Sequence, residues 1–242
     1  MENNMESNRN NYVLQTVNLT KKMRRTAIVK GMNLQVRPGT VYGLLGPNGA
    51  GKSSTLKMLT GIWHPTSGDI LFEGHKWSRE DLKDISALIE TPPLYGNLTA
   101  RENLKVKTTM LGMKESRIEE VLDAVELTGT GRKRAREFSL GMKQRLGIAL
   151  ALINNPRLLI LDEPTNGLDP IGIQELRALI RSLAQQGMTV ILSSHILSEV
   201  EQVADDIGII VNGVLGYQNR ISREENLEEL FMDIVKKYGQ AG

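Results

Sequence analysis

The sequence predicts an α/β fold with an antiparallel β part at its N-terminal end and an inserted helical subdomain. Three observations support this fold. An apolar strand at 40–45 runs directly into a Gly-rich turn and a helix at 52–60, which is how a βαβ unit begins. A continuous apolar run at 158–161 indicates a strand that is buried on both faces. The intervening segment 91–155 carries apolar residues at helical spacing, as at Ile118, Val121, Leu122 and Val125.

The other predicted elements extend this core in both directions. Short apolar runs alternate with basic turns at 12–36, which predicts β structure. After the strand at 158–161 we expect a helix that ends at Gly187, and Asn212-Gly213 predicts a hairpin turn. Between Gly187 and Asn212 we expect a strand at 189–192, a helix, and a strand at 207–211. The helix is expected to carry Ile196, Val200 and Val203.

The domain division follows from the same pattern. Residues 1–11 are polar and Asn-rich, and we expect a disordered tail because they offer nothing to bury. Residues 12–221 form one domain, with the helical subdomain at about 91–155. The amphipathic segment 222–242 is predicted to be a C-terminal helix.

Composition excludes several classes of function. The formal net charge is only +2 and aromatic residues make up 4% of the chain, so nothing predicts a nucleic-acid partner. There is no Cys, hence no disulfide framework and no thiolate metal site. We find no signal peptide and no apolar run of the roughly 20 residues that a membrane-spanning helix needs. We expect a soluble chain whose membrane role, if any, depends on a partner.

A Gly-rich segment matches the phosphate-binding pattern G-x-x-x-x-G-K-[ST] between the predicted strand and helix. We expect the backbone N–H groups of 48–54 to surround a phosphate, Lys52 to reach the β- and γ-phosphates, and Ser53 to bind Mg²⁺. A chance Gly-rich turn is the alternative, and the flanking elements argue against it. The candidate nucleotide-binding residues here are Gly46, Pro47, Asn48, Gly49, Ala50, Gly51, Lys52, Ser53 and Ser54.

Two acidic residues follow the buried strand at 158–161. Asp162 is expected at the carboxyl end of the sheet, where ligands of open α/β sheets bind, and it can hold Mg²⁺. Glu163 can polarise the attacking water as a general base. The alternative is that these residues merely cap a helix before Pro164.

The segment Phe138-Ser-Leu-Gly-Met-Lys-Gln-Arg145 resembles the signature motif of ABC ATPases. By itself Ser139 is a helix N-cap. The resemblance implies that Ser139 and Gly141 begin a helix that faces the γ-phosphate bound by a second subunit. Residues 166–170 resemble the family's D-loop, and His195 resembles the switch histidine that contacts the γ-phosphate.

This resemblance spans roughly 12–221 and implies an ABC-type P-loop NTPase core. It implies an ATPase that uses ATP and Mg²⁺ and that pairs, as a homodimer or with another ATPase subunit, when ATP is bound. It also implies that the chain drives an integral-membrane permease from the cytoplasmic face of the cell membrane. Glu163 and His195 are its expected catalytic residues. The segment 91–104 is the candidate surface for the permease's coupling element.

Several positions depart from the family pattern. Glu90 occupies the place of the glutamine that binds Mg²⁺ and senses the permease, and a carboxylate there can still bind the metal. The other interpretation of Glu90 is an ordinary surface loop residue. Leu140 and Met142 replace the common Gly and Gln, and Met23 takes the place of the aromatic residue that stacks on adenine.

Glu90 and the residues around the signature resemble the antibiotic-export branch of the family. The nearest resemblance is to ATPase subunits of lantibiotic self-protection transporters, with bacitracin-type exporters as neighbours. The alternatives are the ATPase of another drug exporter, an importer subunit, and a soluble ABC ATPase acting on ribosomes or DNA. Soluble ABC ATPases of that kind usually join two ATPase cassettes in one chain or contain a long coiled coil. This chain shows neither feature.

Overall fold

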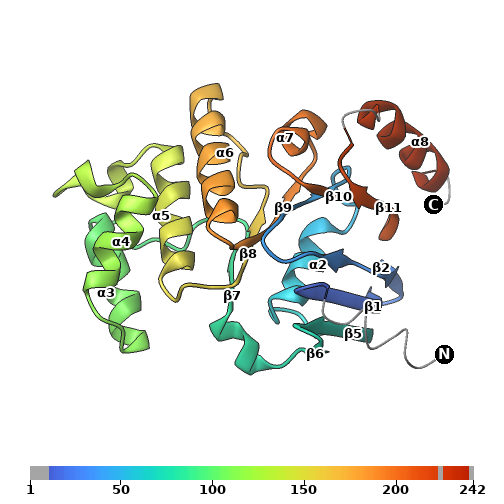
Figure 1. Cartoon of the computed structure of the whole chain (residues 1–242), viewed down its shortest axis with the longest axis horizontal. Coiled ribbons are helices and arrows are strands. Elements are labelled where there is room, and N and C mark those ends of the chain that lie inside the picture. Colours follow the sequence, from blue (N-terminus) through green and yellow to red (C-terminus); the bar gives the residue numbers. More distant parts are fainter. Residues whose placement is uncertain (1–10, 223–225, 240–242) are drawn as a thin grey trace.

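A computed structural model describes residues 11–222 and 226–239. Nearly all of the tail predicted at 1–11 lies outside these residues, as do 223–225 and 240–242 of the C-terminal segment. The described chain contains two sheets, and the helices between residues 100 and 152 lie together at one end of the molecule (Figure 1).

The first sheet is antiparallel and is built from the N-terminal part of the chain, as predicted. Its strand order is β2-β1-β5-β6, with β3 also pairing with β1. The basic turn at 24–25 joins the first two strands, whose ends pair Met23 with Thr26. The strands are β1 (Leu14–Met23), β2 (Thr26–Met32), β3 (Gln35–Val36), β5 (Ser67–Phe72) and β6 (His75–Lys76).

The second sheet has the order β11-β10-β4-β9-β8-β7 and is parallel except for β11, which runs antiparallel to β10. Every residue of the four central strands is buried, which explains why their sequences are apolar without alternation. The strands are β4 (Val41–Leu45), β7 (Ile85–Leu88), β8 (Leu158–Asp162), β9 (Thr189–Ser194), β10 (Asp206–Val211) and β11 (Val214–Arg220).

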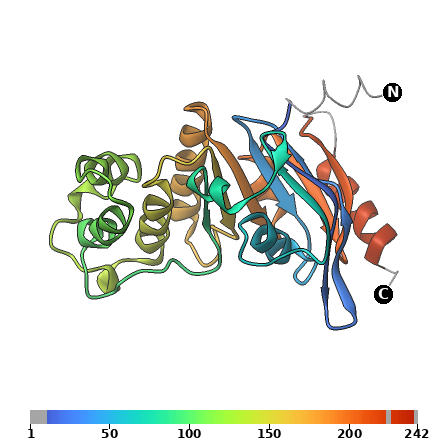
Figure 2. The same cartoon turned by 90° about the horizontal axis from the view of Figure 1, so that it is seen from below.

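Three α-helices lie between β7 and β8 in the sequence and stand apart from the antiparallel sheet (Figure 2). They are α3 (Ala100–Leu111), α4 (Ser116–Ala124) and α5 (Leu140–Leu152). The predicted apolar stripe of α4 faces inward, and this confirms the inserted helical part. The remaining helices are α2 (Lys52–Leu59), α6 (Pro170–Gln185), α7 (Leu197–Glu201), α8 (Leu227–Gly239) and the short 3₁₀ helices η1 (Arg79–Lys83), η2 (Thr128–Thr130) and η3 (Ala135–Glu137).

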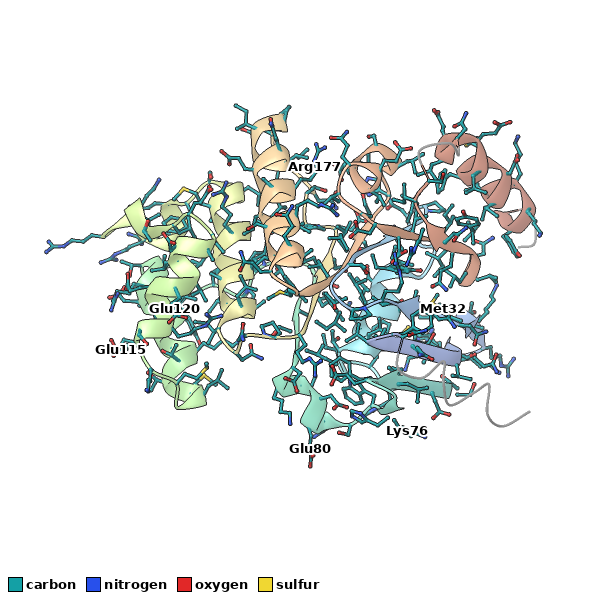
Figure 3. The ribbon with its side chains drawn as sticks, viewed as in Figure 1. Met32, Lys76, Glu80, Glu115, Glu120 and Arg177 are labelled. Carbon is teal, nitrogen blue, oxygen red and sulfur yellow. The ribbon has the colours of Figure 1, made fainter. Side chains whose placement is uncertain are left out.

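The parallel sheet separates two apolar cores. Along β4, Val41 and Leu45 face the core shared with the inserted helices and α6, whereas Tyr42 and Leu44 face the core shared with α2 and the antiparallel sheet. Met32 is buried in this second core, while Glu115 and Glu120 lie on the outer surface of the helical part (Figure 3). Both faces of the sheet are thus covered, which fixes its carboxyl edge as the accessible place for a ligand.

One predicted helix is shorter than expected. Helix α7 covers only Leu197–Glu201. Ile196 before it is extended and 39% exposed, with its N–H donating to the Ser194 hydroxyl, and Val203 follows the helix rather than lying in it. Among the described residues, no helix is both long and apolar enough to cross a bilayer.

Candidate functional site

Three neighbouring parallel strands bring the predicted residues together. In the sheet β4 lies beside β9 and β9 beside β8, with Leu45 opposite Ser194 and Ser193 opposite Asp162. The carboxyl ends of these strands therefore meet at one edge, as the strand pattern of the sequence predicts. The loop after β4, the acidic pair after β8 and His195 after β9 all leave the sheet at this edge.

The loop at 46–51 is a glycine-rich turn that leads into α2. Gly49 and Gly51 have φ of 79° and 107°, a conformation that favours glycine. Lys52, the first residue of α2, is 5% exposed, and its Nζ donates to the backbone oxygens of Gly46 at 2.7 Å and Pro47 at 3.3 Å. The lysine side chain therefore curls back over the loop and holds a buried positive charge at its mouth.

The Asp162 carboxylate lies beside the Ser53 hydroxyl. Asp162 is 4% exposed, and its Oδ1 accepts hydrogen bonds from the hydroxyls of Ser53 at 3.1 Å and Ser193 at 2.6 Å. Ser193 was not predicted as a site residue, although it directly follows the apolar part of β9. Its hydroxyl also accepts the backbone N–H of Glu163 at 2.9 Å, so it ties the two acidic residues to β9.

Glu163 connects the phosphate-loop lysine to the histidine. Its Oε1 lies 3.1 Å from Nζ of Lys52, and its Oε2 lies 2.6 Å from Nδ1 of His195. Glu163 has a φ of 49°, which is uncommon for a residue other than glycine. Lys52, Glu163 and His195, from three different strand ends, thus form one charged network.

The predicted signature residues lie elsewhere on this chain. Ser139 caps α5 by accepting the Met142 N–H at 3.2 Å, and Ser139 and Leu140 are exposed. The beginning of α5 packs on the loop that precedes α6, where a Cβ on Gly167 would lie 2.9 Å from Leu140 Cδ2. Among the described residues, no hydrogen bond or ion pair joins Ser139 or Gly141 to the network around Lys52.

Glu90 and Met23 also lie apart from that network. Glu90 is 66% exposed, and its Oε1 lies 2.6 Å from Nζ of Lys57 on α2, so the structure does not bring it to Ser53 or Asp162. Lys57 in turn lies over the ring of Trp63, 5.0 Å from its centroid. Met23 is half exposed at the tip of the β1–β2 hairpin. The contact between Lys57 and Glu90 was not predicted from the sequence.

The oxygen groups near the loop suit a small hard cation. A hydroxyl and a carboxylate are the protein ligands that Mg²⁺ prefers, and Ser53 and Asp162 present this pair. Within residues 11–222 and 226–239, no group of three or more His, Cys, Asp or Glu side chains is placed to hold a metal ion. The arrangement fits a metal that keeps waters and shares ligands with a bound phosphate.

The chain is similar to known proteins over most of its length. Residues 29–166 match the family model described as ABC transporter. The lantibiotic transport ATP-binding protein SrtF of Streptococcus pyogenes is 55% identical over 219 residues, which are 90% of this chain and 96% of that protein. The bacitracin transport ATP-binding protein BcrA of Bacillus licheniformis is 48% identical over 230 residues, 93% of this chain and 72% of that protein. A solved ATP-binding subunit of an ABC transporter superposes with a TM-score of 0.81 at 28% identity, covering 92% of this chain and 99% of the other.

Proposed function

This chain belongs to the ABC transporter family of ATP-binding, ATP-hydrolysing proteins, and on that premise we propose that it powers the export of a lantibiotic or a similar peptide antibiotic. The ATPase activity is supported by the charged network of Lys52, Glu163 and His195, which lies beside Ser53 and Asp162. The substrate class rests on the similarity to the lantibiotic and bacitracin transport proteins. The ATPase of another drug exporter or of an importer is the alternative.

ATP is held by the loop at 46–54 and the beginning of α2. Backbone N–H groups at a helix N-terminus attract phosphate, and the buried ammonium of Lys52 supplies the compensating charge. Ser53 and Asp162 hold Mg²⁺, which neutralises charge on the phosphate oxygens when it is bound. The exposed side chain of Met23 packs on the adenine ring.

Glu163 acts as the general base that takes a proton from the attacking water. Lys52 and His195 hold the two oxygens of its carboxylate, and Ser193 holds its backbone, so the side chain has little freedom to turn away. His195 is one third exposed beside it and is the candidate contact for the γ-phosphate.

The exposed start of α5 completes the site in a second copy of the chain. Ser139 and Gly141 lie apart from their own Lys52, and the positive end of the α5 dipole favours an anion. We therefore assign them to the γ-phosphate that the partner subunit binds. ATP between the two copies then favours the closed state over the open one, which is what a switch requires.

The permease docks in a groove between the parallel sheet and the inserted helices. A cavity of about 470 Å³ lies there, and its rim includes the exposed side chains of Tyr95, Met110 and Leu111. Lys107 lines it too, and burial lowers the pKa of Lys107, whose Nζ donates to the Leu150 oxygen at 2.7 Å. This groove adjoins 91–104 and would hold the chain at the cytoplasmic face of the membrane through its permease.

The docking groove can be tested with a matched pair of variants. Met110→Glu places a charge in the groove, whereas Met232→Glu makes the same change at an exposed position on α8. We expect Met110→Glu to lose co-purification with the permease and to keep ATP binding, and Met232→Glu to keep both. Equal co-purification of the two variants would place the docking surface elsewhere.

The export function is tested in cells that carry the chain with its permease. We expect survival in the presence of a lantibiotic, and loss of survival when Glu163→Gln replaces the normal chain. Protection against bacitracin alone would favour the neighbouring type of exporter. ATP hydrolysis without protection against either peptide would indicate another transported substrate.

A further inference from the structure

The turn between β10 and β11 lies against the outer side of the phosphate loop. Val211 pairs with Val214, so Asn212 and Gly213 form a two-residue hairpin turn, with φ of 48° and 81°. The Gly213 N–H donates to the Ala50 oxygen in the phosphate loop at 2.8 Å, and the Gly213 oxygen accepts from the Lys30 N–H of β2 at 2.8 Å. One turn thus joins the loop to the antiparallel sheet.

At this junction the backbones of the turn and of the phosphate loop pack against the backbone of β2. Glycine is required in both the turn and the loop. A Cβ on Gly213 would lie 2.5 Å from the Ile28 oxygen. A Cβ on Gly51 would lie 2.7 Å from the same oxygen and 3.6 Å from Gly213 Cα. Because main-chain atoms cannot move aside as a flexible side chain can, the loop, the turn and β2 fit in one arrangement.

The same turn is bonded to the C-terminal helix. Asn212 Nδ2 donates to the Tyr238 oxygen at 2.8 Å. Tyr238 lies in the last turn of α8, where carbonyl groups have no partner within the helix, so Asn212 supplies one. Helix α8 packs on β10 and β11 (Figure 1), closely enough that a Cβ on Gly216 would lie 2.8 Å from Ile234 Cγ2.

These contacts bear on the direction of the Gly51 N–H, which belongs to the loop proposed to bind phosphate. The peptide bond is planar and trans, so the Ala50 oxygen and the Gly51 N–H point in opposite directions. Since Gly213 holds the Ala50 oxygen toward the turn, the Gly51 N–H points away from the turn and into the loop. A loop that binds phosphate through N–H groups depends on that orientation.

We propose that Asn212 and Gly213 are positioning residues for the phosphate loop and that α8 tunes nucleotide affinity through them. This rests on the proposed role of 46–53 in holding ATP. Loosening the turn lets the Ala50–Gly51 peptide rotate, so nucleotide binding weakens. The chemical step changes little, because Glu163 and His195 are held by separate contacts.

The test uses the full chain and a ribose-labelled fluorescent ATP. Asn212→Asp keeps the size of the side chain and tolerates positive φ, but it removes the donor to Tyr238. Asn219→Asp is the matched control on β11, because its Oδ1 accepts the Arg220 N–H and keeps that bond as Asp. We expect the Kd of Asn212→Asp to rise by about three- to tenfold, the size expected for one hydrogen bond, with kcat within about twofold. The control should match the normal chain.

A second variant shows whether α8 acts through this bond. Ile234→Ala weakens the packing of α8 without touching the turn. If α8 acts through Asn212, the increases in Kd from Ile234→Ala and Asn212→Asp will not multiply in the double variant. Independent effects would contradict the role of α8.

Several results would overturn the proposal. One is an unchanged Kd for a folded Asn212→Asp, and another is a loss of kcat at unchanged Kd. Should Asn212→Asp fail to fold, Asn212→Gly replaces it, because glycine also suits this turn position. Lys52→Ala in the same titration separates the two hypotheses, since normal ATP binding by that variant would reject the phosphate loop itself.

Discussion

The carboxylate of Glu163 bridges the ammonium of Lys52, 3.1 Å away, and the ring of His195, 2.6 Å away. The residue proposed to activate water is therefore paired with the residue proposed to bind phosphate. A phosphate group that approaches Lys52 competes with Glu163 for the same charge. Nucleotide binding and the position of the base are in this way linked through a single ion pair.

Glu163→Gln should keep ATP binding and lose hydrolysis. The amide keeps the shape of the side chain but is not a base, so we expect turnover to fall by about 100-fold or more. It also gives up the charge that competes for Lys52, so we expect ATP affinity to be equal or higher. Single-turnover phosphate release and an ATP titration measure the two effects, and size-exclusion chromatography should show ATP-bound dimers. Turnover within about threefold of the normal chain would exclude Glu163 as the base.

Lys52→Ala should abolish tight ATP binding. It removes a buried charge from the mouth of the loop, and each lost charge-assisted hydrogen bond weakens binding by roughly tenfold or more. Lys76→Ala is the control, because Lys76 is an exposed lysine whose partner, Asp69, has a half-exposed side chain. Isothermal titration with ATP distinguishes them, and retained affinity in Lys52→Ala would reject the phosphate-loop assignment.

Much of this site was predictable because its parts are local in sequence. The apolar run before Gly46 and the one before Asp162 predict buried parallel strands, and such strands deliver their following residues to one edge. The glycines at 49 and 51 predict the positive φ that the loop adopts. Asn212-Gly213 likewise predicts the hairpin turn that the structure confirms.

The features that could not be predicted depend on the order of the strands in the sheet and on contacts between residues far apart in the sequence. Nothing in the sequence places β9 between β4 and β8, so Ser193 could not be assigned to Asp162. Strand β7 has four residues and follows a polar segment, so no periodicity marks it. The contact of Lys57 with Glu90 joins residues 33 positions apart, outside any local pattern.

Ser139 has two possible roles, and two substitutions separate them. Ser139→Ala removes the cap of α5, which costs about 1 kcal/mol of stability whatever the function. Ser139→Asp keeps a capping oxygen but adds a negative charge where the partner's γ-phosphate is proposed to bind. We expect Ser139→Asp to unfold at nearly the normal temperature and to lose ATP-induced dimers. Normal dimerisation and hydrolysis by Ser139→Asp would leave Ser139 as a helix cap alone.

The carboxylate of Glu90 is paired with Lys57 rather than with Ser53 or Asp162. If Glu90 joins the Mg²⁺ site when ATP is bound, it must leave Lys57. An exposed ion pair of this kind contributes only about 0–1 kcal/mol, so the exchange is feasible. Lys57→Met should then lower the Mg²⁺ concentration that gives half-maximal ATPase by at most about fivefold. The same substitution should have no effect in a Glu90→Gln background, since the carboxylate that Lys57 restrains is gone.

Glu90→Gln by itself should keep the fold and ATP binding and mainly impair coupling. An amide is a weaker ligand for a hard cation and presents a different hydrogen-bonding face to the permease. We therefore expect a larger loss in survival of peptide-treated cells than in basal ATPase of the purified chain. Glu90→Ala should impair both, because it removes the ligand outright. The two measurements are made on the same variants, with ATPase followed against Mg²⁺ and survival measured with the permease present. Full protection by both variants would mean that Glu90 is an ordinary loop residue paired with Lys57.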